Sequence, residues 1–291
     1  MALTPQTLQR LGDFKVRARA VMEGVLSGLH KSPHQGQSVE FAEHHEYAPG
    51  DELRHVDWKA VARFDRYYVK RFEHETNLRA VMLVDASGSM GYGSRGQTKL
   101  ELARTLAGAL SWLLVRQQDA AGLTALEGER LVEVPPRAAA GHVHVLLDAL
   151  EGLKPQGALS LRLATDRLAE SLPRRSLVAV FSDFFDADEG ALAHLLTLKS
   201  RRHDVALFHL LDPDELEFPF EDPTRFESLE DARFLEANPR EIRESYLEEL
   251  GAFIARTKAQ AVAAGCDYQV VRTDEAPDDV LLRFLAARQA R

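Results

Sequence analysis

One aspartate and two serines stand close together at the end of an apolar run. Ala80–Val84 is apolar without alternation, which is typical of a strand buried on both faces of a parallel sheet. Asp85 ends this strand, and Ser87 and Ser89 follow, with Gly88 permitting a tight turn. Ligands of open α/β sheets bind at the carboxyl ends of strands, so we expect these side chains in a crevice. Their oxygens suit Mg²⁺ or Mn²⁺, and the spacing predicts a metal site.

A second carboxylate follows another buried strand. Ser176–Ser182 is apolar at its centre and is followed by Asp183. In a doubly wound sheet, Asp183 would lie beside Asp85 at the point where the strand order reverses. A helix-capping aspartate is the alternative interpretation.

The rest of the chain alternates strand and helix patterns, which predicts an α/β fold with a doubly wound, mostly parallel sheet. Further predicted strands are Ala120–Leu126, Arg130–Val134, Val205–Leu211 and Asp267–Arg272. Predicted helices are Leu100–Val115, His142–Leu153, Leu159–Leu172, Ala187–Ser200, Arg240–Ala264 and Asp278–Ala290. Pro135 and Pro136 predict that the strand from Arg130 stops before them.

The first part of the chain predicts a helix-and-strand extension. Thr4–Leu29 has a helical apolar stripe, and Ser38–Phe41 and Arg66–Phe72 have strand character. We therefore divide the chain into an N-terminal extension, residues 1–77, that packs on a main domain of residues 78–291.

A turn-and-charge segment lies inside the extension. Pro49-Gly50 is a strong turn signal. The residues around it predict either a structural clasp or a partner-docking surface, and they are Asp51, Arg54, Asp57, Trp58 and Arg63.

Residues 212–238 interrupt the strand–helix rhythm of the main domain. Ten acidic residues stand in this insertion, against two arginines. Four phenylalanines and three prolines are interleaved with them, and the prolines forbid one continuous helix. The segment is either an arm that packs its phenylalanines or an acidic interaction edge.

These motifs together resemble a known bacterial family. The D-x-S-x-S spacing resembles the metal-ion-dependent adhesion site (MIDAS) of von Willebrand factor A (vWA) domains. The longer pattern is similar to the vWA-like family catalogued as domain of unknown function 58. The matching stretches are Tyr47, Pro49 to Asp51, Arg54, Asp57-Trp58, Ala62-Arg63, Asp85 to Met90, Phe181 to Phe184, Leu211 to Glu217 and Thr273-Asp274.

The resemblance implies a metal site and a partner. A vWA-type site also uses a threonine from the loop before the strand that ends at the second acid. The corresponding loop here, residues 154–160, has no threonine, and Ser160 is the hydroxyl that could replace it. Members of the family are typically encoded beside a MoxR-type AAA+ ATPase, which implies an adaptor or co-chaperone role with that ATPase and a client protein.

Composition excludes several other classes of protein. The 291 residues are 45% hydrophobic and 28% charged, as in ordinary globular proteins, and the formal net charge is -9. An acidic chain argues against a nucleic-acid partner, because phosphate binding needs a basic face. No apolar run has the length of a membrane span, and a single cysteine, Cys266, excludes an internal disulfide. We expect a cytoplasmic protein.

The function predicted first is therefore a metal-dependent protein-binding module rather than an enzyme. Ser87 and Ser89 lack the G-x-S-x-G surroundings of a hydrolase nucleophile, and the D-x-D pattern of aspartyl phosphatases is absent. A metal-dependent hydrolase is the less favoured alternative. A third interpretation is a metal-free scaffold that binds through residues 31–77 or 212–238.

Overall fold

The computed structural model describes residues 13–31, 44–46, 68–70, 78–128, 130–158, 160–186, 188 and 190–289. The chain divides into two units, one of Met1–Leu29 with Leu78–Arg291 and the other of His30–Asn77. In the second unit, β1 (His44–Glu46) pairs antiparallel with β2 (Tyr68–Lys70). The predicted strand Ser38–Phe41 lies outside the described residues. So do the five predicted partner-binding residues, Asp51, Arg54, Asp57, Trp58 and Arg63. The predicted boundary after residue 77 stays a prediction.

The larger unit is built on a six-stranded sheet with the order β10-β7-β6-β3-β4-β5. Its strands are β3 (Arg79–Asp85), β4 (Ala120–Glu127), β5 (Arg130–Arg137), β6 (Leu177–Ser182), β7 (Asp204–Leu211) and β10 (Asp267–Arg272). All neighbours pair in parallel except β4 and β5, which are antiparallel. The predicted doubly wound, mostly parallel α/β sheet is confirmed.

The prediction that prolines end the third strand is wrong. β5 continues through Pro135 and Pro136 to Arg137. It is an edge strand, where a missing N–H need not face a partner, and its pairing with β4 is irregular between Ala121 and Leu123. Gly122 lets β5 approach β4 closely here because it has no side chain. A Cβ at this position would lie 2.8 Å from the Pro136 nitrogen.

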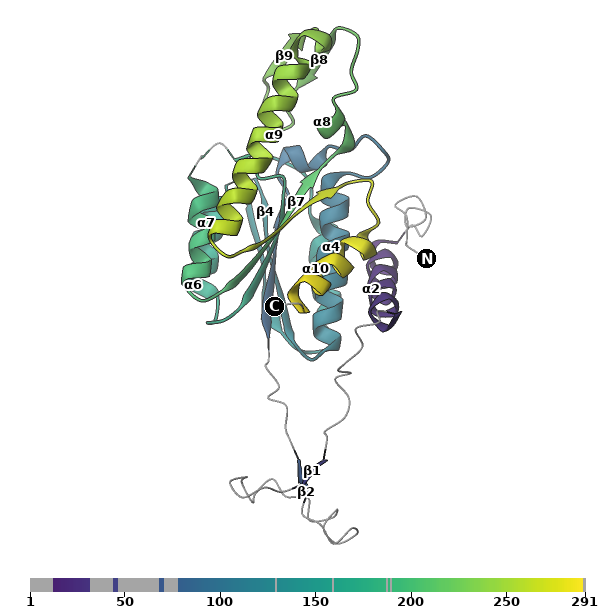
Figure 1. Cartoon of the computed structure of the whole chain (residues 1–291), viewed down its shortest axis with the longest axis vertical. Helices are drawn as coiled ribbons and strands as arrows, with labels where there is room; N and C mark the ends of the chain where they lie inside the picture. Colours follow the sequence, from purple (N-terminus) through teal and green to yellow (C-terminus); the bar gives the residue numbers. More distant parts are fainter. Residues whose placement is uncertain are drawn as a thin grey trace. The chain divides into compact units, whose positions relative to one another are not determined.

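Helices cover both faces of the sheet, as the two buried clusters and Figure 1 show. One face carries α2 (Phe14–Lys31), α4 (Lys99–Arg116), α5 (His142–Gly152) and α10 (Pro277–Gln289). The other carries α6 (Leu161–Ser171), α7 (Ala191–Ser200) and α9 (Pro239–Ala263). Among the described helices, none is both long and apolar enough to cross a membrane.

The described helix α2 covers part of the predicted helix Thr4–Leu29, of which residues 4–12 lie outside the described residues. It begins at Phe14 because the Asp13 carboxylate accepts the backbone N–H of Lys15 at 2.7 Å, as a helix N-cap does, and it runs to Lys31 rather than Leu29. Phe14 and Ala18 pack against α4 at Gly108, whose missing side chain leaves room for them.

The predicted irregular insertion contains three short elements. The helix α8 (Pro213–Glu217) follows β7, and β8 (Thr224–Glu227) pairs antiparallel with β9 (Phe234–Ala237). The hairpin lies at the end of α9 that is farthest from the sheet, at the top of Figure 1. We call residues 218–238 the arm.

Candidate functional site

The two predicted acids lie at the ends of neighbouring strands. β3 and β6 pair in parallel, with Val84 opposite Phe181. Asp85 is the last residue of β3, and Asp183 directly follows β6; both side chains are buried. β4, which follows β3 in the chain, lies on the other side of β3, so the strand order reverses between β3 and β6. The acids therefore stand at the topological switch point.

Asp85 is held by two hydrogen bonds. Its Oδ1 accepts the backbone N–H of Ser87 at 2.8 Å, and its Oδ2 accepts the Ser182 hydroxyl at 2.6 Å. Burial and the negative charge of Asp183 nevertheless raise the pKa of Asp85 to about 7. Ionising the Asp85 carboxyl group without a positive partner therefore costs free energy, and a nearby cation would stabilise the ionised form.

The two serines project from one tight turn. The Oγ atoms of Ser87 and Ser89 are 3.1 Å apart, and Ser87 precedes a 3₁₀ helix, Gly88–Gly91. The loop before α6 lies beside this turn, since Gly88 N–H donates to the Gly157 carbonyl at 2.8 Å. Asp85, Ser87, Ser89 and Asp183 thus come from two segments that meet at one end of the sheet.

Ser160 is placed differently from the other four predicted ligands. It is half-buried and precedes α6, and its carbonyl accepts the N–H of Ala164 at 3.3 Å. Among the described residues, no hydrogen bond joins its hydroxyl to Asp85, Ser87 or Asp183. Ser160 stays a predicted ligand.

A buried lysine lies against the second acid. Lys99 is fully buried, and its Nζ donates to Asp183 Oδ2 and to Glu215 Oε1, each at 2.7 Å. Burial lowers the pKa of Lys99, but the charges of Asp183 and Glu215 outweigh it and hold that pKa above its usual value. Lys99 therefore carries a permanent positive charge beside the predicted metal ligands.

The donor set fits a hard divalent cation. Two carboxylates and two hydroxyls are oxygen ligands of the kind that Mg²⁺ and Mn²⁺ prefer. Within the described part of the chain, no three His, Cys, Asp or Glu side chains are grouped closely enough to hold a metal ion. Binding here would therefore depend on Ser87 and Ser89 as well as on the acids, with Asp183 already neutralised by Lys99.

The arm lies directly on the turn that carries Ser87 and Ser89, which we call the serine turn. A Cβ added to Gly88 would stand 1.9 Å from the Leu229 carbonyl oxygen and 3.1 Å from the Glu230 nitrogen. Gly88 is therefore required for this close approach as well as for the turn. The acidic insertion therefore contacts the turn that carries two of the predicted metal ligands.

Sequence reasoning missed two residues of this cluster. Ser182 supports both Asp85 and the backbone N–H of Phe184, yet it looks like the polar end of an apolar strand. Lys99 shares a helix face with Leu102, Ala103 and Leu106, which are all buried. This helical spacing was the available signal that Lys99 points inward.

The strand order and the acids at its switch point define a doubly wound α/β domain. A family model described as "Protein of unknown function DUF58" matches residues 43–252. The chain belongs to this family.

Two mycobacterial proteins and two solved structures are similar to this chain. The uncharacterized proteins Mb1516 of Mycobacterium bovis and Rv1480 of Mycobacterium tuberculosis are each 26% identical to this chain, over 98% of it and 90% of their own length. The conserved hypothetical protein BatB from Bacteroides thetaiotaomicron is similar in structure at 14% identity, with a TM-score of 0.47 over 74% of this chain and 100% of that chain. The SpRpn10 VWA domain is similar at 12% identity, with a TM-score of 0.39 over 70% of this chain and 94% of that one.

Proposed function

We propose that the protein is a metal-dependent protein-binding module that acts as an adaptor or co-chaperone for a MoxR-type AAA+ ATPase in the cytoplasm. The observation that carries the metal part is the buried carboxylate of Asp85, beside the paired hydroxyls of Ser87 and Ser89 at the switch point. The ATPase part is supported by the family resemblance alone. No catalytic residue is assigned.

Asp85, Ser87 and Ser89 would hold the metal, with Asp183 as the second acid. When bound, Mg²⁺ or Mn²⁺ supplies an electrophilic position that an acidic side chain of a partner can occupy, because the ligand set has few charges to neutralise it. The chain's own residues position this site: Ser182 fixes the Asp85 carboxylate, and Lys99 fixes that of Asp183.

The test of metal binding is calorimetric titration of Mg²⁺ and Mn²⁺ into the wild type, Asp85→Ala and the exposed control Asp222→Ala. We expect saturable binding in the wild type and the control, and none in Asp85→Ala. Absence of binding to the wild type would refute an independent metal site.

The ATPase role is tested separately, by co-elution with the MoxR-type ATPase of the same organism. We expect a complex whose formation needs Mg²⁺ or Mn²⁺ and is lost in Asp85→Ala. The rate of ATP hydrolysis with and without the protein measures whether the complex changes activity. A complex that forms equally well in EDTA would contradict the metal-dependent mode.

The metal-free scaffold is a second candidate because of two observations. The ammonium group of Lys99 already gives Asp183 a positive partner, and the arm already lies on the serine turn. In this alternative, partner binding survives Asp85→Ala and is lost when residues 31–77 or 212–238 are altered, for example by Trp58→Ala.

A further inference from the structure

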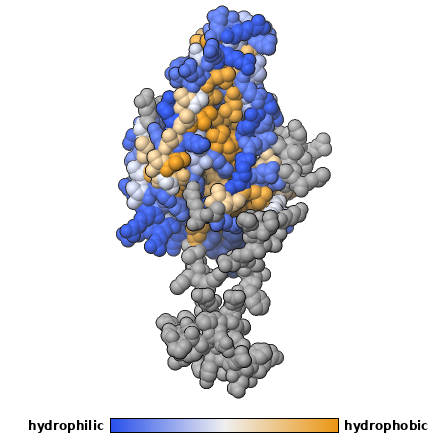
Figure 2. Space-filling model, in the orientation of Figure 1, coloured by the Kyte–Doolittle hydropathy of each residue, from blue (hydrophilic) through white to orange (hydrophobic). Residues whose placement is uncertain are grey.

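An aromatic cavity adjoins the serine turn, beneath the arm. Its volume is about 340 Å³. Six aromatic side chains line it, and they are Tyr92, Phe185, Phe218, Phe220, Phe226 and Tyr246. Figure 2 shows an apolar area in the upper half of this face, bordered by hydrophilic surface, in the region where Figure 1 places α8 and α9. The opening is thus an apolar hollow in an otherwise polar part of the molecule.

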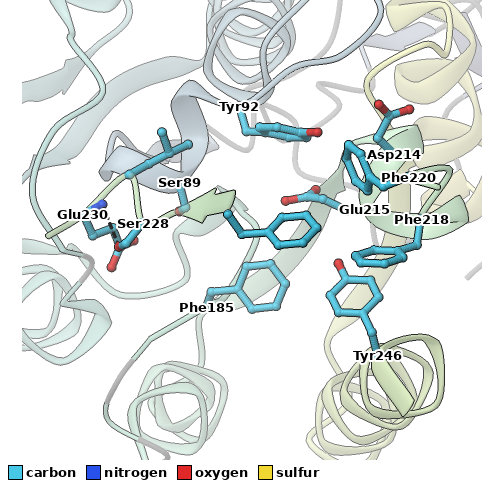
Figure 3. Close-up of a pocket in the computed structure, with 12 residues that line it drawn as sticks. Ser89, Tyr92, Phe185, Asp214, Glu215, Phe218, Phe220, Ser228, Glu230 and Tyr246 are labelled. Carbon is cyan, nitrogen blue, oxygen red and sulfur yellow. Dashed lines mark hydrogen bonds between the residues drawn. The ribbon is translucent and has the colours of Figure 1, made fainter. Parts of the chain in front are cut away.

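Mutual packing holds the rings in place. The ring of Phe218 lies 4.6 Å from that of Tyr246 and 5.3 Å from that of Phe220, between centroids. It also stacks on Phe226 at 5.7 Å. Phe218 has a φ of 45°, a left-handed conformation that is unfavourable for a bulky residue. The surrounding contacts therefore maintain the position of this ring, and Figure 3 shows the aromatic side chains arranged around a common space.

Carboxylates stand among the rings. Asp214, Glu215 and Glu230 line the cavity. In Figure 3, Glu230 lies beside Ser89, and Asp214 lies on the opposite side of the cavity. Glu215 is already paired with Lys99. Glu230 differs. Its carboxyl group interacts with Ser89, but its Oε1 atom is buried and has no hydrogen-bond partner among the described residues. A buried, unpartnered carboxylate oxygen is costly unless a ligand supplies a donor.

Aromatic faces and a carboxylate with one unpartnered oxygen together favour a cation on an apolar stem. Aromatic rings attract ammonium and guanidinium groups through their negative faces. Long basic side chains bury their methylene groups against apolar surface while their charged ends find a polar partner. The insertion around the cavity adds long-range attraction, since residues 212–238 hold ten acidic residues and two arginines.

We propose that this cavity binds a basic side chain, lysine or arginine, of a partner polypeptide, with its stem among the rings and its charged end at Glu230. The inference rests on the proposed function as a protein-binding module and deepens it. Ser89 belongs both to the predicted metal ligands and to the cavity wall. One partner segment with neighbouring acidic and basic residues would therefore reach both places.

Three short peptides test the proposal on the full-length protein: acetyl-Gly-Arg-Gly-amide, the same peptide with norleucine, and the same with glutamate. Affinities are measured by saturation-transfer NMR in EDTA, so metal binding plays no part. We expect the arginine peptide to bind about fivefold more tightly than the norleucine peptide, and the glutamate peptide not to bind.

Matched variants locate the binding. Glu230→Gln keeps the shape and removes the charge, so it should weaken the arginine peptide about fivefold and the norleucine peptide less than about twofold. Phe220→Leu should weaken the arginine peptide through loss of an aromatic face. Glu236→Gln, on the exposed side of the same arm, is the control and should change nothing.

Three outcomes would overturn the proposal. They are equal binding of the arginine and norleucine peptides, unchanged arginine binding in Glu230→Gln, and no binding of any peptide at about 10 mM, a concentration that detects even millimolar affinity. Because the assay contains no free divalent metal, its failure is separate from failure of the calorimetric test. A metal-binding protein that ignores all three peptides would keep the proposed function and lose this inference.

Discussion

The Nζ atom of Lys99 lies 2.7 Å from Oδ2 of Asp183, and both side chains are completely shielded from solvent. Lys99 is the first residue of α4, and Asp183 directly follows β6, so this ion pair joins a helix start to a strand end. The second bond of Lys99, to Glu215, extends the link to α8. One ammonium group thus connects the switch point to the start of the acidic insertion.

The first prediction concerns the stability that depends on this ion pair. Lys99→Met keeps the apolar stem but leaves the buried Asp183 and the largely buried Glu215 without their cation. Removing one partner of a buried pair costs about 3–5 kcal/mol in the free energy of unfolding. Chemical denaturation of the metal-free protein measures it. Lys258→Met, at an exposed position of α9, is the control and should stay within about 0.5 kcal/mol of the wild type. A loss below about 1 kcal/mol for Lys99→Met would show that Asp183 tolerates isolation.

The second prediction concerns the contact between the arm and the serine turn. Gly88→Ala places a methyl group against the Leu229 carbonyl, which is backbone and cannot rotate away. The arm must move, and we expect faster amide hydrogen exchange in residues 228–237 and a loss of about 1–3 kcal/mol, as for overpacking.

A glycine in open surroundings provides the control for this change. Gly251 lies in α9 with no atom within 4 Å of an added Cβ, so Gly251→Ala should stabilise the helix by about 0.5–1 kcal/mol. Native-like protection of the arm in Gly88→Ala would mean that the turn and the arm are not coupled.

Much of the sheet could be predicted because burial on both faces leaves a clear pattern. β3 is buried at every position after Arg79, and its apolar run predicts such a strand. The meeting of Asp85 and Asp183 followed from the rule that parallel strands end at one edge of a sheet. The continuation of β5 through Pro135 and Pro136 could not be predicted. Prolines are tolerated in an edge strand, and the sequence does not reveal which strand lies at the edge of the sheet.

Other features of the site depend on contacts between distant parts of the chain. A lysine side chain is usually expected at the surface. The burial of Lys99 is explained by its ion pairs with Asp183 and Glu215, which only the fold brings close to it. The close approach of Leu229 to Gly88 joins two loops with no common pattern. Ser160 was chosen from the position of its loop, and the sequence alone does not give the distance between its hydroxyl and the acids.

The third prediction concerns the pH dependence of stability at Asp212. This buried carboxylate accepts the Ser94 N–H at 3.0 Å and the Thr273 hydroxyl at 2.7 Å. Burial raises the pKa of Asp212, but the hydrogen bonds from Ser94 and Thr273 outweigh it and place that pKa below its ordinary value. The folded state therefore favours the ionised form. The resulting stability is fully present above the unfolded-state pKa of about 3.9 and is lost as pH falls through the lower, folded-state value.

Asp212→Asn measures this contribution. At pH 6 we expect it to lower the free energy of unfolding by about 2 kcal/mol, because charged hydrogen bonds are replaced by weaker ones. The difference from wild type should shrink as the pH is lowered below about 4. The exposed Asp222→Asn should show no such trend. A difference that stays constant down to the acid transition would contradict the assignment.

The fourth prediction connects the Lys99 charge with metal affinity. In the proposed site, the ammonium group of Lys99 neutralises one of the two carboxylate charges and repels a divalent cation, so it weakens metal binding. Lys99→Met should raise the affinity for Mn²⁺ by about tenfold or more, provided circular dichroism shows a folded protein. Glu215→Gln leaves Lys99 bound to Asp183 alone and should lower the affinity. Opposite shifts from removing the ammonium group and from removing the charge of its partner Glu215 are difficult to obtain from general destabilisation. Calorimetry at low salt measures both affinities. If both variants bind Mn²⁺ as the wild type does, the ion does not sense Lys99 and must lie away from Asp183.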